Sequence, residues 1–158
     1  ESAELKDNLQ DRIDDKADAI KDRKVEIGTS NINDEEDFTE DDLEAAGIEE
    51  VDEENLDAYI GLRNLVKENL IKDVPLTAAD IQNIVNAVNA FVYDEEAGKI
   101  FGDKVSLTGA VWVRDLYLGT AGGVTMNGLL RADMDQNGEI SVTDIIDILY
   151  IIAKAVQG

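Results

Sequence analysis

The amino-acid sequence predicts an all-α protein, with a helical N-terminal region followed by a pair of loop-helix units. Apolar residues recur at spacings of three and four along most of the chain, which is the period of amphipathic helices. Two capping-box patterns, Thr39-Glu-Asp-Asp42 and Thr77-Ala-Ala-Asp80, indicate helix starts. The only proline, Pro75, separates two of the predicted helices.

The first part of the chain is predicted to be helical over residues 1–27, 40–46, 53–71 and 77–91. The first of these helices carries only a narrow apolar stripe, formed by Leu5, Leu9, Ile13, Ala17 and Ile20. The last two carry a fuller apolar face each. Those faces are Leu56, Tyr59, Ile60, Leu62 and Leu65, and then Ile81, Ile84, Val85, Val88 and Phe91. We therefore expect packed helices here rather than disorder.

The composition excludes several classes of function. The chain has 158 residues, of which 36 are acidic and 14 basic, so its formal net charge is −22. Such a charge argues against nucleic acid and against anionic membrane surfaces as partners. With no Cys and no His, the chain has no thiol nucleophile, no disulfide, no Cys/His zinc site and no Ser-His-Asp triad. Carboxylates remain, and they bind hard cations.

Acidic residues are concentrated in residues 34–57, which hold 14 Asp or Glu and no basic residue. Helix-start signals interrupt this run, and acids near helix N-termini are favoured by the helix dipole. We interpret the run as solvated helix surface in preference to a dedicated cation-binding or partner-binding patch. No membrane span is predicted, because the longest apolar stretch, 148–153, is far shorter than the roughly 20 residues required. The chain starts at Glu1, so a signal peptide could have preceded it.

The composition changes after residue 91, where glycine becomes frequent. Nine of the twelve glycines lie in residues 98–158. We therefore divide the chain into an acidic helical region of unknown role, 1–91, and a second module, 92–158.

Residues 133–144 have the ligand spacing of a calcium-binding loop. Oxygen-bearing side chains occupy positions 1, 3, 5, 9 and 12, which are Asp133, Asp135, Asn137, Ser141 and Asp144. Gly138 stands at position 6, where the loop turns sharply, and Glu139 can offer its carbonyl at position 7. A plain polar turn is the alternative. The number of matching positions, and the amphipathic helix that follows, favour Ca²⁺.

The string that contains this loop resembles a dockerin repeat. It runs Ala132-Asp133-x-Asp135-x-Asn137-Gly138-x-Ile140-Ser141-x-Thr143-Asp144-Ile145 and continues with Ile148-Leu149-Tyr150-Ile151, and it ends with Asp144 where the usual EF-hand loop has Glu. Dockerins are small calcium-binding modules that dock bacterial extracellular proteins onto cohesin domains of scaffoldins. They contain two such repeats.

A damaged first repeat lies 35 residues upstream, where Val105-Ser106-Leu107-Thr108-Gly109 aligns with Ile140-Ser141-Val142-Thr143-Asp144. Its loop, 98–109, has Gly98, Ile100, Gly102 and Gly109 at positions 1, 3, 5 and 12, and none of these side chains can ligate Ca²⁺. We therefore predict one calcium per chain. The damaged loop is expected to keep its shape by packing of Ile100, Phe101, Val105 and Leu107.

The resemblance implies calcium-dependent docking to a cohesin-type partner outside the cell, without catalysis or membrane insertion. The partner-binding residues that it implies are Val142, Thr143, Leu149, Tyr150 and Lys154. Helical spacing instead assigns Leu149 to the core, together with Ile140, Ile145, Ile148 and Ile152.

Two other hypotheses remain. The first is an ordinary EF-hand pair, a calcium-stabilised structural or sensor domain. In it, residues 124–132 form a helix entering the loop, and residues 77–91 form the entering helix of the degenerate hand. An EF-hand has about nine helical residues or more before Asp133, whereas a dockerin has little or no helix there. The second is a small secreted hydrolase with paired carboxylates.

Overall fold

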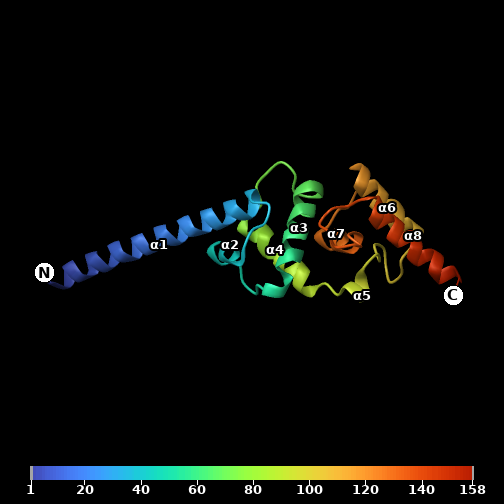
Figure 1. Ribbon diagram of the computed structural model, residues 1–158. Coiled ribbons are helices and arrows are strands. Elements are labelled where there is room, and N and C mark those ends of the chain that lie inside the picture. Colours follow the sequence, from blue (N-terminus) through green and yellow to red (C-terminus); the bar gives the residue numbers. More distant parts are fainter. Residues whose placement is uncertain (1, 158) are drawn as a thin grey trace. The chain divides into compact units, whose positions relative to one another are not determined.

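The computed structural model describes residues 2–157, and in this range its secondary structure is entirely helical, as the sequence predicts. Figure 1 shows the elements in chain order. They are α1 (Ser2–Asp34), α2 (Glu40–Ala45), the 3-10 helix η1 (Glu53–Asn55), α3 (Leu56–Asn69), α4 (Ala78–Ala90), α5 (Tyr93–Glu96), α6 (Leu107–Leu118), α7 (Met126–Ala132) and α8 (Val142–Gln157).

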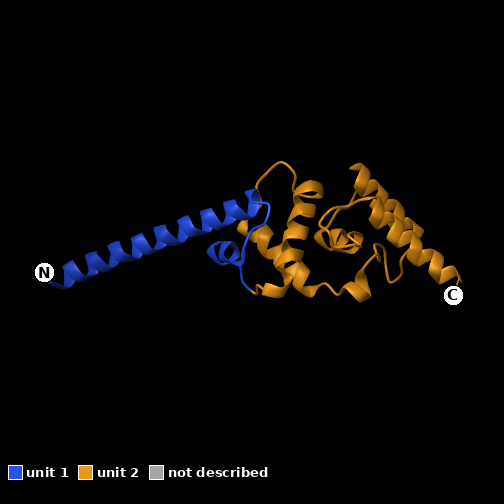
Figure 2. Cartoon of the chain, in the orientation of Figure 1, with its two compact units in different colours: residues 1–49 blue, residues 50–158 orange. Residues whose placement is uncertain are grey.

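The chain divides into two compact units, residues 1–49 and residues 50–158 (Figure 2). The second unit begins well before the change in composition at residue 91. Helices α3 and α4 therefore belong to the same compact unit as the candidate calcium loop. The division by composition into 1–91 and 92–158 stays a prediction about functional modules.

The first unit is built by the packing of α2 on the C-terminal part of α1. Gly28 and Ile32 of α1 are buried, as are Phe38 and Leu43. The backbones approach so closely that a Cβ on Gly28 would lie 2.6 Å from both the Ala46 nitrogen and the Asp42 carbonyl oxygen. Only glycine fits at this contact.

The start of α2 is held by the predicted capping box. The backbone N–H of Asp42 donates to the Thr39 hydroxyl, and the N–H of Thr39 donates to Asp42 Oδ2 at 2.9 Å. Asn31 of α1 also donates to Asp42 Oδ1, at 2.8 Å. Burial raises the pKa of Asp42, but these hydrogen bonds outweigh it and bring the pKa below its ordinary value.

Helices α3, α4 and α7 pack together in the second unit. Their fully buried side chains are Tyr59, Leu62, Leu65, Val66, Ile81, Ile84, Val85 and Leu129. Tyr59 is the one with a polar group to satisfy, and its hydroxyl donates to Asn89 Oδ1 at 2.6 Å and accepts from the Asp52 N–H at 2.9 Å. The apolar faces predicted for residues 53–71 and 77–91 are thus the faces that meet.

Helices α6 and α8 form a pair, lying side by side and running in opposite directions (Figure 1). Ala110, Val113 and Leu116 of α6 are buried, and so is Ile148 of α8. Ser106 caps the start of α6 by accepting from the Gly109 N–H, and Gly119 ends it with a left-handed φ of 77°. The helices of the two predicted loop-helix units therefore pack on one another in antiparallel orientation.

The predicted helices occur close to their expected positions, with two differences. Helix α1 runs to Asp34 instead of ending at residue 27, because its last turns pack on α2. The short helix α5 was not predicted. Its start is held by Glu96, whose Oε2 accepts from the Val92 N–H at 2.7 Å.

We predict that Gly28→Ala destabilises the first unit by about 1–3 kcal/mol, because the added methyl group forces α1 and α2 apart. In an exposed helix interior the same change stabilises by about 1 kcal/mol, so the sign of the effect tests the contact. Urea unfolding followed by circular dichroism measures it, with Asn8→Ala on the exposed part of α1 as the control. An increase in stability for Gly28→Ala would show that the two helices do not pack in this way.

Candidate metal centre

Three carboxylates converge where α7 ends and α8 begins. Asp133 is the C-cap of α7, Asp135 lies two residues further on, and Asp144 is in the first turn of α8. One oxygen from each of the three lies within 4.8 Å of the others. Asp133 is 7% exposed and Asp144 is fully buried. Such a group can hold a metal ion.

Asp144 ties the two ends of the loop together. Its Oδ1 accepts from the backbone N–H of Met134 at 2.8 Å, and its Oδ2 accepts from the N–H of Ser141 at 2.9 Å. The carboxylate therefore closes a ring of chain that runs from the end of α7 to the start of α8. This ring fixes the first turn of α8.

Only one of the two carboxylate oxygens of Asp133 has a hydrogen-bond partner in the described structure. Its Oδ2 accepts from the Gly138 N–H at 3.0 Å, whereas its Oδ1 is buried and has no hydrogen-bond partner in the described structure. A buried carboxylate oxygen without a partner is costly, and a cation in the ring of carboxylates would satisfy it.

The pKa values of Asp133 and Asp144 are raised, as expected for clustered carboxylates without a neighbouring positive charge. Burial, followed by the nearby negative charges of Asp144 and Asp135, raises the pKa of Asp133 from 3.8 to about 7. Burial also raises the pKa of Asp144, although the N–H groups of Ser141, Asp135 and Met134 act in the opposite direction. A bound cation would reverse these shifts because it favours the ionised forms.

The loop between these carboxylates is curled by short turns, in which a side-chain oxygen accepts from the backbone N–H two residues later. Asn137 Oδ1 accepts from the Glu139 N–H at 3.0 Å, and Asp135 Oδ1 lies 3.4 Å from the Asn137 nitrogen. Gln136 and Gly138 adopt positive φ, 56° and 78°. Gly138 thus has the left-handed conformation expected at position 6 of the loop.

Gly138 is also where the loop rests on α3. A Cβ on Gly138 would lie 2.9 Å from the Cα of Gly61, so the two backbones are in direct contact. A second attachment comes from Tyr93, whose hydroxyl donates to the Met134 carbonyl at 2.6 Å. The loop is therefore seated on residues from the region 50–96.

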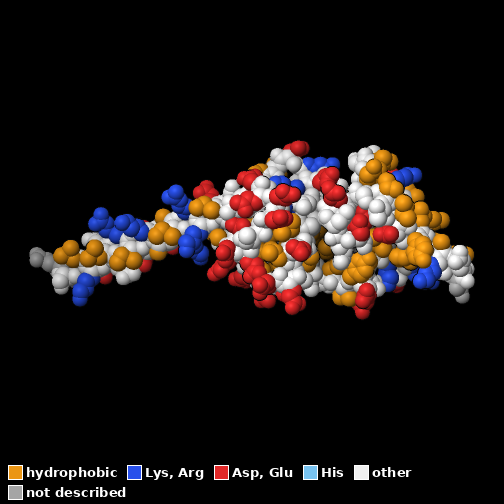
Figure 3. Space-filling view, in the orientation of Figure 1, with side chains coloured by type: hydrophobic (Ala, Val, Ile, Leu, Met, Phe, Trp, Pro, Cys, Tyr) orange, Lys and Arg blue, Asp and Glu red, His pale blue; other side chains and the backbone are white. Residues whose placement is uncertain are grey.

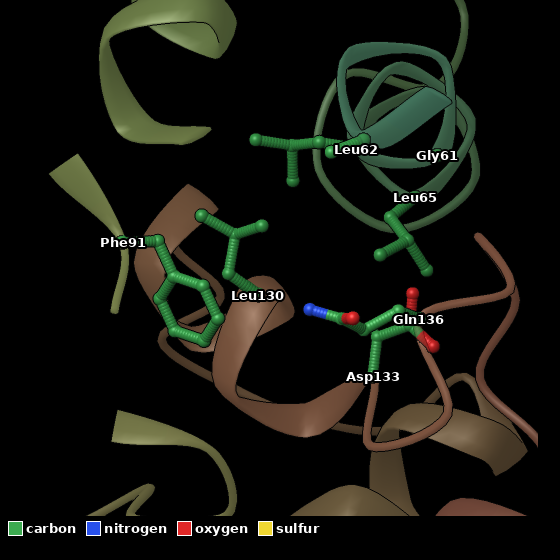
Figure 4. Close-up of a pocket in the computed structure, with 8 residues that line it drawn as sticks. Gly61, Leu62, Leu65, Phe91, Leu130, Asp133 and Gln136 are labelled. Atoms are coloured by element: carbon green, nitrogen blue, oxygen red, sulfur yellow. The ribbon is translucent and has the colours of Figure 1, made fainter. Parts of the chain in front are cut away.

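A pocket opens beside this contact and is lined on one side by the loop. Figure 4 shows Leu62, Leu65, Phe91 and Leu130 around it, with Asp133 and Gln136 contributed by the loop and the end of α7. Its walls are mainly aliphatic and aromatic. The pocket places apolar side chains next to Asp133, which accounts for the burial of that carboxylate.

The damaged loop 98–109 is closed by apolar contact instead of charge. A Cβ on Gly109 would lie 3.2 Å from the Ile100 side chain, so position 3 packs directly on position 12. Val105 lies in the same way against Gly98. The expected packing of Phe101 and Leu107 was wrong, because both are exposed. Phe101 makes an edge contact with Trp112, with ring centroids 6.3 Å apart.

The predicted ligands and partner residues occupy distinct places. Asn137, Glu139 and Ser141 lie in the loop, but the Glu139 carboxylate is not in the converging group. The predicted partner residues Val142, Thr143, Leu149, Tyr150 and Lys154 are all exposed. Leu149 therefore does not belong to the core; Ile148 is buried, and Ile140, Ile145 and Ile152 are half-buried.

The helix before Asp133, α7, is seven residues long, which lies between the two lengths that would separate a dockerin from an EF-hand.

Sequence reasoning missed two sets of residues. Gly61 was not singled out, since nothing in the sequence shows that its backbone meets Gly138. The exposed apolar residues Leu107 and Val111 of α6 were also missed as surface residues. They stand 35 positions before the exposed Val142 and Ile146, so the internal repeat was the signal that could have found them.

We predict that, in chelator, the second unit loses stability as the pH rises from about 4 to about 7. The reason is that folded Asp133 binds its proton up to about pH 7, whereas an ordinary Asp releases it near 3.8. The variant Asp133→Asn should flatten this slope and, at pH 7, stabilise the metal-free chain by on the order of 1–3 kcal/mol. Urea unfolding across this pH range measures both effects.

The exposed Asp103→Asn serves as the control, since it removes one carboxylate from the damaged loop without touching the cluster. Its curve should follow that of the native chain. Parallel curves for Asp133→Asn and the native chain would contradict the prediction.

Comparison with known proteins gives no match: no family model, no curated protein and no solved structure matches the chain. Among the described residues 2–157, no helix is both long enough and apolar enough to cross a membrane. The functional assignment therefore depends on the geometry of the loop and on the motif of residues 132–152.

Proposed function

We propose that the second unit is a calcium-dependent docking module that binds a cohesin-type domain of a scaffoldin. The observation that carries the proposal is the buried, unpartnered Oδ1 of Asp133, which lies in a ring of carboxylates with the spacing of a calcium loop. The proposal assigns the module to an extracellular bacterial protein and gives it no catalytic role.

Calcium fits the donor set better than other common cations. The proposed ligands are the side chains of Asp133, Asp135, Asn137, Ser141 and Asp144 with the carbonyl of Glu139, which are all oxygen donors. Ca²⁺ takes 6–8 oxygens in a flexible arrangement, whereas Mg²⁺ requires a near-ideal octahedron and retains water. Zn²⁺ prefers nitrogen and sulfur, and the chain has neither His nor Cys.

The docking face is the exposed side of the α6–α8 pair. Val142, Ile146 and Tyr150 of α8 follow one another at helical spacing and are each about half exposed or more. On α6, Leu107, Val111 and Leu118 are also exposed. Figure 3 shows hydrophobic side chains gathered over these two helices. Apolar patches with polar surroundings are typical of protein-binding surfaces.

The proposed mechanism links the metal to this face through Asp144. The same carboxylate that joins the metal cluster also holds Ser141 at the start of α8. Calcium would offset the repulsion among Asp133, Asp135 and Asp144, so the first turn of α8 would become rigid. Val142 and Thr143 lie in that turn, and their positions would be set before the partner binds, which lowers the ordering cost of docking.

A second candidate function is a calcium-stabilised structural or sensor domain of the EF-hand kind, without cohesin binding. Two observations favour it: the helix α7 in front of the loop, and the close seating of Gly138 on Gly61. In that case calcium would serve mainly to join the loop to α3, and the α6–α8 face would not bind cohesins.

We predict one calcium ion per chain, bound by residues 133–144. Isothermal titration of the native chain should give a single site, and Asp133→Ala should abolish it, because that change removes the ligand at position 1. Thermal unfolding should show a higher Tm for the native chain in millimolar calcium than in chelator. A second site that survives the mutation would show that the damaged loop binds metal.

We predict that a panel of cohesin domains includes a partner that the chain captures in calcium and releases in chelator. Tyr150→Ala combined with Leu149→Ser should weaken this binding at least about tenfold, because two exposed side chains at the centre of the face are lost. Val74→Ser is a matched control: Val74 is 61% exposed, close to the 67% of Tyr150, and lies outside the face. Calcium binding and stabilisation without capture of any cohesin would favour the structural candidate.

A further inference from the structure

Helix α1 has an exposed apolar stripe along its length. The α1 stripe consists of Leu5, Leu9, Ile13, Ile20 and Ile27, and each of these side chains is more than half exposed. Every residue from Ser2 to Lys24 is exposed, and α2 packs only on the C-terminal part of the helix. A helix of this kind gains little stability in water without packing of its apolar face.

The charges on α1 are sorted around the stripe. At 3.6 residues per turn, five of the six basic residues lie within roughly 65° of the stripe's centre. They are Lys6, Arg12, Lys16, Arg23 and Lys24. The acidic residues from Glu4 to Glu26 all lie more than roughly 100° away, on the opposite side. The face that carries the stripe is therefore basic, in a chain whose net charge is −22.

Figure 3 shows this face, on which orange and blue side chains predominate along the N-terminal helix. The basic residues of α1 take part in neither Arg114–Asp115 nor Arg131–Glu96, two ion pairs within the described residues. Their charge is not neutralised within the described chain and is available to a partner.

From this arrangement we infer that α1 is a docking helix for a protein partner that offers an apolar groove bordered by carboxylates. Ile13, Ile20 and Ile27 are seven residues apart, the spacing at which side chains fill successive holes of a facing helix or groove. The five basic residues beside the stripe (Lys6, Arg12, Lys16, Arg23 and Lys24), here called the basic border, would meet the carboxylates on both sides of that groove. This inference is independent of the calcium loop, which lies in the other unit.

The same charges disfavour a second copy of α1 and an anionic membrane as the binding partner of the stripe. A second copy of α1 would place one basic border against another, and the acidic side of the helix carries no apolar stripe to receive the first. An anionic membrane would attract the basic border, but residues 2–27 hold eight acidic against six basic residues, and the whole chain is strongly acidic.

The test uses the full chain and a synthetic helical peptide of heptads with Ile and Leu at a and d and Glu at e and g. The control peptide is identical except for Lys at e and g. Fluorescence anisotropy should show binding of the acidic peptide alone, and binding should weaken as salt rises. Lys16→Glu combined with Arg23→Glu should weaken binding roughly tenfold, because two attractive pairs become repulsive.

Lys21→Glu is the matched control, since Lys21 is the basic residue of α1 that lies farthest from the stripe. It should change binding by no more than about twofold. Equal binding of the two peptides, or an equal loss with Lys21→Glu, would overturn the inference. So would binding to vesicles containing phosphatidylserine in place of the peptide, or self-association that Ile20→Gln abolishes.

Discussion

Mutual repulsion among Asp133, Asp135 and Asp144 is the constraint on which the second unit depends. Three carboxylate oxygens within 4.8 Å of one another, two of them on buried residues, are unfavourable unless a proton or a cation is shared among them. The backbone N–H groups of Met134, Gly138 and Ser141 offset part of this cost. The remainder falls on Asp133 Oδ1, which is buried and has no hydrogen-bond partner among the described residues.

The two loops of the internal repeat have their ends held together by different kinds of interaction. In loop 133–144 the ends are joined by a carboxylate that accepts from both sides. In loop 98–109 the ends are joined by Ile100 packing on Gly109, where an added Cβ would lie 3.2 Å from the Ile100 side chain. Apolar closure needs no ion, whereas the carboxylates of loop 133–144 form a group that could hold one. The loop before α6 is therefore closed by side-chain packing, and the loop before α8 by the hydrogen bonds of a carboxylate.

The helices could be predicted from the sequence because their signals are local. Capping boxes at Thr39 and Thr77 mark where helices begin. Apolar periodicity indicates which helix faces are buried. The candidate metal site was predicted for a similar reason, since all its ligands lie within twelve consecutive residues. Contacts between distant segments could not be predicted. Gly138 contacts Gly61, which stands 77 positions earlier in the chain, and Leu149 is 42% exposed although helical spacing assigns it to the core.

The contact between Gly61 and Gly138 bears on which fragment of the second unit would keep its loop supported. A fragment cut at residue 92, where the composition changes, would remove the helix on which the loop rests and leave its backbone facing water. A fragment beginning at residue 50 would keep that support together with Tyr93. The smallest fragment with this support is therefore set by a glycine in α3, which stands 72 positions before Asp133, the first of the converging carboxylates.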